Sequence, residues 1–254
     1  MQSIPKNTHS KEREKQGVGL ALGLIGLFGA CFAAAELWSE ASGSRIAHLV
    51  TKPFIMVFVA AYFFLSTQHL ALGAQRAKIR VQIFAGLGCS WLGDVALMFT
   101  ASASWVVLVG MGAFAFAHAA YILAFRAGDG RSFLRQARVH YAVALLLFAY
   151  GVALFSILAQ YVAPEMKIPI AGYAVILLSM AFAAFVRRQY AASESFAWAL
   201  AGALAFVASD SILAWHLFVQ PNAALAVALM ALYIFAQSAI VVGMSKEIRR
   251  APRD

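Results

Sequence analysis

The sequence predicts an all-α, polytopic membrane helix bundle with eight transmembrane helices and a 4+4 internal repeat. The first observation is composition: 63% of the 254 residues are hydrophobic and only 12% are charged, about half the charged fraction of a soluble domain. The second is length, because several apolar runs reach the roughly 20 residues that a spanning helix needs. The third is pattern. These runs lack the polar–apolar alternation of a membrane barrel, so helices are the remaining spanning structure.

The predicted spans follow one another with short loops, which favours one compact bundle. They cover residues 17–38, 49–67, 80–99, 104–126, 137–160, 167–186, 195–218 and 222–244. We therefore divide the chain into a polar N-terminal tail (1–16), a transmembrane domain (17–245) and a short basic C-terminal tail (246–254). The first run is long and has no clear small-residue cleavage site, which predicts a retained span rather than a signal peptide.

The basic residues are distributed unevenly along the chain. Of the 20 Lys and Arg residues, all but Arg45, Lys52 and Lys167 fall in the two tails or in every second loop. The positive-inside rule then predicts that both termini are cytosolic, and it supports an even number of spans. This placement explains the net charge of +9 without a nucleic-acid partner. The Ala-rich composition favours a bacterial plasma membrane.

Two aspartates lie deep in apolar segments: Asp94 in GLGCSWLGDVALMF and Asp210 in ALAFVASDSILAWH. We found no other acidic residue placed this way. A carboxylate at the bilayer centre costs about 2.5–3.5 kcal/mol on insertion scales, so such residues usually face a protein interior or a wet cavity and carry function. Asp94 and Asp210 are therefore the primary candidates for the functional site.

Three short patterns recur 115 to 119 residues apart: TKPF and KIPI, the two aspartates with a leucine three residues on, and FAH and FAQ. They suggest two four-helix halves in the same orientation. At 1.5 Å per residue both aspartates then lie about 21–23 Å from the cytosolic edge, so one cavity could hold both. Lys52 is at a neighbouring depth, and His118 is expected about 12 Å below the aspartates.

A carboxyl pair of this kind offers acid and base chemistry. Two carboxyls in a poorly solvated site cannot easily both ionise, so one acts as a general acid and the other as a general base. Ser90 lies one turn before Asp94 on the same helical face. The alternative is a structural pair, with one aspartate bound to Lys52 and the other to hydroxyls of the bundle.

The remaining candidates each allow two interpretations. Lys52 is either a cation for a lipid phosphate or a snorkelling interfacial lysine. The other candidates would either line the cavity and orient a substrate or hydrogen-bond neighbouring helices; they are His118, Tyr121, Tyr173, Tyr233 and Gln237.

We expect no metal ion and no cofactor. His48, His69, His140 and His216 are scattered over loops and helix ends, whereas a zinc hydrolase needs three ligands that converge at one depth. Cys31 and Cys89 fall within predicted spans, and they are interpreted as small packing residues.

The order of the motifs resembles the YhhN family of membrane proteins, which includes the lysoplasmalogenases. The resemblance runs from about Lys52 to Gly243 and rests on TKPF, CSWLGDVALMF, AFAHAAYILAF, IPIAGY, GALAFVASDSILA and LYIFAQSAIVVG. It implies about eight spans and cleavage of the vinyl ether bond of a lysoplasmalogen, or of a related lysolipid, to a fatty aldehyde and a glycerophospho-head-group. Asp94 and Asp210 match the aspartates that look catalytic in that family.

The expected partners are therefore a lysolipid substrate and membrane lipids. Buried aspartates supply an acid to protonate the vinyl ether and a carboxylate to stabilise the cation and activate water. A proton-coupled carrier is the alternative function, because duplicated halves and paired intramembrane acids suit transporters too. A lipid-binding sensor is a third possibility, which no specific feature of the sequence supports.

Overall fold

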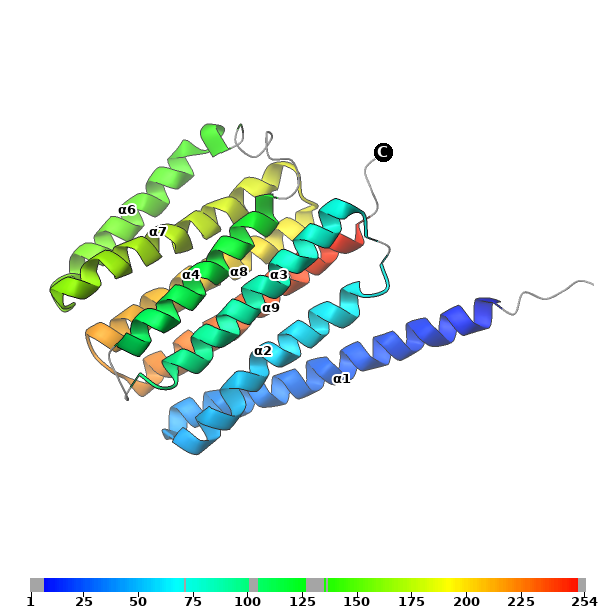
Figure 1. The fold of residues 1–254 in the computed structure, drawn as a ribbon, viewed down its shortest axis with the longest axis horizontal. Coiled ribbons are helices and arrows are strands. Elements are labelled where there is room, and N and C mark those ends of the chain that lie inside the picture. Colours follow the sequence, from blue (N-terminus) through cyan, green and yellow to red (C-terminus); the bar gives the residue numbers. More distant parts are fainter. Residues whose placement is uncertain (1–6, 71, 101–104, 127–134, 136, 251–254) are drawn as a thin grey trace, which may run out of the picture.

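The computed structural model describes residues 7–70, 72–100, 105–126, 135 and 137–250, without the side chains of 7–16. Eight long helices form the described part of the chain (Figure 1). They are α1 (Asn7–Ser42), α2 (Arg45–Thr67), α3 (Ala74–Leu97), α4 (Trp105–Arg126), α6 (Tyr141–Leu158), α7 (Pro164–Val186), α8 (Ser193–Phe218) and α9 (Ala223–Arg249). A 3-10 turn, η1 (Arg187–Gln189), joins α7 to α8.

Seven of these helices are long and apolar enough to cross a membrane, which makes the chain a multi-pass integral membrane protein. The exception is α3, which is more polar because Arg76, Lys78 and Arg80 lie in its first two turns and Asp94 lies near its end. The predicted count of eight spans and the 4+4 repeat therefore stay predictions.

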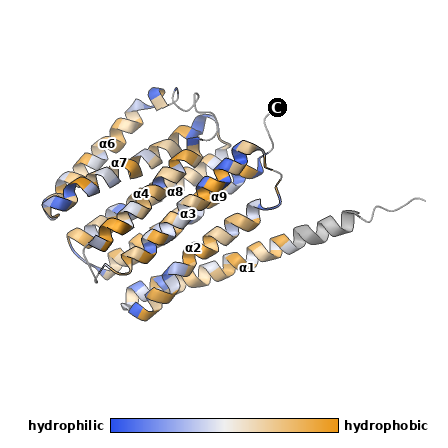
Figure 2. Cartoon of the chain, in the orientation of Figure 1, coloured by the Kyte–Doolittle hydropathy of each residue, from blue (hydrophilic) through white to orange (hydrophobic). Residues whose placement is uncertain are grey.

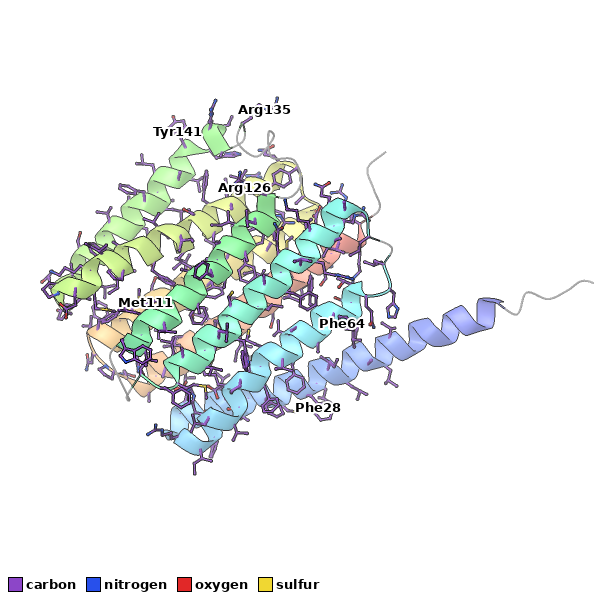
Figure 3. All side chains as sticks on the ribbon, viewed as in Figure 1. Phe28, Phe64, Met111, Arg126, Arg135 and Tyr141 are labelled. Carbon is purple, nitrogen blue, oxygen red and sulfur yellow. The ribbon has the colours of Figure 1, made fainter. Side chains whose placement is uncertain are left out.

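The helices form a central group with two flanks. In Figure 1, α3, α4, α8 and α9 lie in the middle, the α1–α2 hairpin lies along one side, and α6 lies along the other beyond α7. The main pairings are α8 with α9, α3 with α4 and α1 with α2. Phe28 on α1 and Phe64 on α2, labelled in Figure 3, are about half exposed. Such apolar surface suits contact with lipid tails.

Small residues let α8 and α9 approach each other closely. A Cβ atom on Gly202 would lie 2.7 Å from the Ala236 carbonyl oxygen and 2.8 Å from the Ile240 nitrogen. A Cβ atom on Gly243 would lie 2.8 Å from the Ala199 nitrogen. Helices in membranes associate through such close packing, because lipid tails provide no hydrophobic drive for it. These two glycines therefore set the spacing of the central pair.

Glycines also receive aromatic rings where α3 meets α4. The ring of Tyr121 occupies the space beside Gly86, and the ring of Phe114 occupies the space beside Gly93. A Cβ atom at either glycine would approach those ring carbons to 2.2 Å and 2.6 Å. The two glycines of α3 thus determine where the rings of Phe114 and Tyr121 pack along that helix. Both rings contribute to the site described below.

Basic side chains gather at the end of the bundle where α4, η1 and α9 end. Figure 2 shows hydrophilic residues at this end, and also where α7 starts at the other. Arg187 is buried at the end with the basic side chains: its guanidinium donates to Ser195 Oγ at 2.8 Å and pairs with Glu247 at 3.3 Å. Its Cζ also lies 5.5 Å from the centroid of the Phe125 ring. These contacts fasten η1 to α4, α8 and α9.

The helix bounds follow the predicted spans closely, with most differences at the ends. α1 starts at Asn7 and ends at Ser42, α2 starts at Arg45, α3 starts at Ala74 and α9 continues to Arg249. Hydropathy detects only the apolar stretch, whereas a helix can extend past the hydrocarbon core into polar surroundings. The helical residues 7–16 and 246–249 belong to the two predicted tails, and the division into domains stays a prediction.

We expect Gly202→Ala to lower the free energy of unfolding by about 1–3 kcal/mol, because the added methyl group meets backbone atoms that cannot move independently. Gly88→Ala is the matched control, since a Cβ atom placed there would have no neighbouring atom within 4 Å. Thermal unfolding in detergent measures the difference. Equal melting temperatures for the two variants would contradict the proposed role of Gly202.

Candidate functional site

Asp94 on α3 is held in a buried hydrogen-bond network with α4 and α9. Tyr233 donates its hydroxyl to Asp94 Oδ2 at 2.6 Å. Gln237, one turn further along α9, donates Nε2 to Ser90 Oγ at 2.9 Å and accepts the Tyr121 hydroxyl at 2.6 Å. All five side chains are buried. A buried polar group that lacks a partner is costly, so this closed set of donors and acceptors allows a carboxyl group in an apolar bundle.

Asp210 on α8 has a separate set of partners from α4 and α7. Tyr173 donates its hydroxyl to Asp210 Oδ2. His118 Nε2 lies 3.1 Å from the Tyr173 hydroxyl and 3.6 Å from Asp210 Oδ2. His118 is fully buried, and its Nδ1 atom has no hydrogen-bond partner among the described residues. The three groups form a short chain along which a proton can pass.

A cluster of aromatic rings connects the two networks. The Phe206 ring lies 4.7 Å from the His118 ring and 5.5 Å from the Tyr233 ring, both nearly edge-on. The Phe114 ring lies 5.9 Å from Tyr233 and 6.3 Å from Phe206. Edge-to-face packing at these separations is favourable. The two carboxyl groups are thus arranged around one rigid aromatic cluster.

An apolar cleft of about 810 Å³ reaches Asp210 from the side of α6 and α7. Most of its lining is aliphatic or aromatic, and it includes Met111 of α4, labelled in Figure 3. The polar side chains in it are Asp210, Tyr173, Tyr150 and Ser211, and the last two hydrogen-bond each other at 2.7 Å. The cleft has the apolar character of a site for a lipid chain.

A second cavity, of about 790 Å³, opens between α1, α2, α3, α8 and α9 and has a more polar lining than the cleft. Its lining includes four basic or imidazole side chains and one carboxylate: Arg45, His48, Lys52, His216 and Glu40. Lys52 has no ion-pair partner within 4 Å among the residues that the structure describes, so its ammonium group is available to an anion. We call these two spaces the apolar cleft and the polar cavity.

The apolar cleft and the polar cavity share three lining residues, Leu97, Leu213 and Leu217. Leu97 follows Asp94 by three residues, and Leu213 follows Asp210 by three. Side chains at that spacing lie on the same face of a helix. Each aspartate therefore lies about one turn from a leucine that lines both spaces, and the two leucines follow their aspartates at the same spacing on α3 and α8.

The structure groups most of the predicted site residues into these two networks. Ser90, Tyr121, Tyr233 and Gln237 gather around Asp94, while Tyr173 and His118 gather around Asp210. Lys52 lines the polar cavity. The side chain of Asp94 is 3% exposed and is not part of the cleft lining, so a single cavity that holds both carboxyl groups stays a prediction.

The predicted depth of His118, about 12 Å below the aspartates, is wrong. The side chain lies 3.6 Å from Asp210 Oδ2. The estimate assumed upright helices and a core about 30 Å thick. It compared backbone heights only and left out the length of the two side chains, which reach toward each other.

Sequence reasoning also missed a buried acid. Glu36 near the end of α1 is fully buried, although only Asp94 and Asp210 were singled out. Glu36 and Glu40 are one helical turn apart, and His48 Nδ1 lies 2.8 Å from one and 3.2 Å from the other. The sequence feature that could have indicated this acid is the pair of glutamates four residues apart at the end of an apolar run. The same feature is equally typical of a helix end at the membrane interface.

We expect Gln237→Leu to destabilise the bundle by about 1–3 kcal/mol for each buried group left without a partner. Tyr121 and Ser90 both lose their hydrogen bond to the amide. Gln189→Leu changes the same residue type at an exposed position of η1 and should melt like the parent protein. The comparison is made by thermal unfolding in detergent, and a Gln237→Leu protein as stable as Gln189→Leu would count against the network.

Comparison with known proteins gives matches over most of the membrane domain. The sequence profile of the YhhN family matches residues 47–244. The chain is 35% identical over 156 residues to lysoplasmalogenase TMEM86B of Homo sapiens. This alignment covers 61% of the present chain and 60% of the human protein. The chain is 30% identical over 164 residues to the Sus scrofa protein of the same name, covering 65% and 63%.

The aligned region thus spans less than two thirds of these relatives. No solved structure matches the chain. The family profile covers well over half of the sequence and includes both buried aspartates. The chain therefore belongs to the YhhN family.

Proposed function

We propose that this protein is a membrane-embedded hydrolase that cleaves the vinyl ether bond of a lysoplasmalogen, or of a related lysolipid, to a fatty aldehyde and a glycerophospho-head-group. Relatives at 30–35% identity carry the name lysoplasmalogenase. The observation that carries the proposal is a set of three leucines that line both the apolar cleft and the polar cavity, the junction leucines Leu97, Leu213 and Leu217, close to the carboxyl groups of Asp94 and Asp210.

The two spaces match the two ends of a lysolipid. The apolar cleft would take the hydrocarbon chain, because its lining is almost entirely aliphatic and aromatic. The polar cavity would take the head-group, with Lys52 and Arg45 near the phosphate. The bond between chain and glycerol would then lie at the junction leucines, about one helical turn from Asp94 and Asp210.

The cleavage we propose begins with proton transfer from an aspartic acid to the outer alkene carbon, which turns the vinyl ether into an oxocarbenium ion. A carboxylate stabilises this cation and removes a proton from water as its oxygen bonds to the cationic carbon. The resulting hemiacetal breaks its carbon–oxygen bond, with a proton moving from the hydroxyl to the leaving glycerol oxygen. Aldehyde and alcohol leave, and no electron carrier is consumed.

Asp210 is the carboxyl group we place next to the reacting alkene, because it lines the apolar cleft. Tyr173 and His118 are the neighbouring groups that would relay its proton. Asp94 would complete the pair from the other side of the aromatic cluster, oriented by Tyr233. Catalysis by such groups depends on their being held in place before the substrate arrives.

We also propose that α3 is the eighth span and that both termini face the cytosol. Helix α3 packs along α4 and contributes Asp94, Ser90 and the close contacts of its glycines to the centre of the bundle. The end of the bundle that holds Arg126, Arg187 and Arg249 would be the cytosolic one under the positive-inside rule. The polar cavity then opens on the outer side.

We expect Asp94→Asn and Asp210→Asn each to lower aldehyde release from a lysoplasmalogen by about 100-fold or more, the usual contribution of general acid–base groups. The assay uses protein purified in detergent, with melting temperature and elution profile to verify folding. Glu194→Gln, which removes a well-exposed carboxylate, serves as the control and should retain the parent rate.

Near-normal turnover by either folded Asp variant would contradict the acid–base scheme. A parent protein that releases no aldehyde from any lysolipid in detergent, yet moves a lipid or protons in sealed vesicles, would favour a carrier. Aldehyde release in detergent and transport in sealed vesicles can both be measured without knowing the natural substrate.

We expect Lys52→Gln to raise the KM for a phosphate-bearing lysolipid by about tenfold with little change in kcat. A charge-assisted hydrogen bond contributes about 1.5–3 kcal/mol, and about 1.4 kcal/mol corresponds to a factor of ten. Lys167→Gln is the matched control, because Lys167 lies at the start of α7 and lines neither space. An unchanged KM in Lys52→Gln would remove this residue from the head-group site.

A further inference from the structure

Three potential metal ligands converge where α1 turns into α2. Glu36 and Glu40 lie in the last two turns of α1, and His48 lies in the first turn of α2. One ligand atom from each side chain falls within 4.8 Å of the other two. His48 Nδ1 lies 2.8 Å from a Glu36 oxygen and 3.2 Å from a Glu40 oxygen. The cluster is distinct from the networks around Asp94 and Asp210.

The short distances in this cluster lack the angular geometry of hydrogen bonds. His48 Nδ1 and Glu36 Oε1 are both buried, and neither has a hydrogen-bond partner among the described residues, although they are only 2.8 Å apart. The N–H direction of the ring therefore does not point at the carboxylate oxygen. Two ligands of one zinc ion, each about 2.0–2.2 Å from the metal, also stand roughly 3–3.5 Å apart without pointing at each other.

The second oxygen of Glu36 is held by hydroxyl groups. Thr51 on α2 donates to Glu36 Oε2, and Ser39 donates to the same oxygen at 3.2 Å. Both hydroxyl residues are buried. Metal-binding carboxylates are characteristically oriented by such outer partners. The hydroxyls leave Oε1 free and turned toward His48, which is the arrangement a ligand atom needs.

Charge also favours a cation at this position. Glu36 is fully buried, and no Lys or Arg nitrogen lies within 4 Å of either glutamate in the described part of the chain. Burying an uncompensated carboxylate is expensive, so the two glutamates need a positive charge, which either a protonated His48 or a metal ion bound to a neutral His48 would supply. One divalent ion would neutralise the two charges.

We propose that Glu36, Glu40 and His48 bind a divalent transition-metal ion of the zinc type. Two carboxylate oxygens and one imidazole nitrogen suit such an ion better than calcium or magnesium, which prefer all-oxygen sites. Glu40 and His48 also line the polar cavity, so the remaining coordination position faces solvent there. The ion would join α1 to α2 and fix this wall of the cavity.

The experiment measures Zn²⁺ binding to the full chain, purified without an affinity tag in detergent and stripped with a chelator. We expect one Zn²⁺ per chain by equilibrium dialysis with elemental analysis, and a higher melting temperature with Zn²⁺ than without. Glu40→Gln and His48→Gln should each weaken binding at least tenfold. Thr51→Val, which leaves all three ligands in place, should weaken it less. His140→Gln, at the opposite end of the bundle, should bind like the parent.

A stripped protein that takes up no stoichiometric Zn²⁺, and whose melting temperature Zn²⁺ does not raise, would overturn the proposal. That outcome would leave a protonated His48 paired with both glutamates as the explanation of the cluster. Binding that is unchanged in both Glu40→Gln and His48→Gln would overturn it equally. Glu40 is only partly buried, so we expect its variant to fold. The test therefore needs no change at the fully buried Glu36.

Discussion

The central constraint on this bundle is that two carboxyl groups lie inside an apolar structure and must be hydrogen-bonded there. Tyr233 and Tyr173 meet this need, one for Asp94 and one for Asp210. Their hydroxyls cannot form these bonds unless α9 lies against α3 and α7 against α8 at fixed depth. The glycine contacts of α3 and α8 set the packing of the central helices. Packing and polar satisfaction therefore depend on each other.

The sequence predicted the class of fold and singled out the polar residues that the structure groups around Asp94 and Asp210, because hydrophobic runs and polar residues within them are both local signals. That these residues form the functional site stays a prediction. The span limits, Asp94, Asp210 and the polar residues around them could all be read from the sequence. The partners could not be assigned: which tyrosine meets which aspartate depends on helix tilt and on the reach of the side chains, and His118 was misplaced for that reason. Glu36 was missed because an acid at the end of an apolar run also fits an interfacial helix end.

The protein has a space suited to hydrocarbon, the apolar cleft, close to a space with charged side chains, the polar cavity. Leu97, Leu213 and Leu217 line both the apolar cleft and the polar cavity, and the catalytic candidates Asp94 and Asp210 precede the first two by three residues. An amphiphile that fills both spaces would be held by its hydrocarbon chain and its head-group, and these contacts would position the reacting bond without touching it. Such positioning by remote parts of a substrate is a general source of catalytic rate.

The most direct test is an experimental structure of the protein with a lysolipid whose vinyl ether is replaced by a saturated alkyl ether, which the proposed acid cannot cleave. The account predicts the chain in the apolar cleft, the ether oxygen beside Leu97 and Leu213 within reach of Asp210, and the phosphate near Lys52. A chain bound instead against Phe58 and Tyr62 between α1, α2 and α9, with both aspartates distant from the ether, would contradict it.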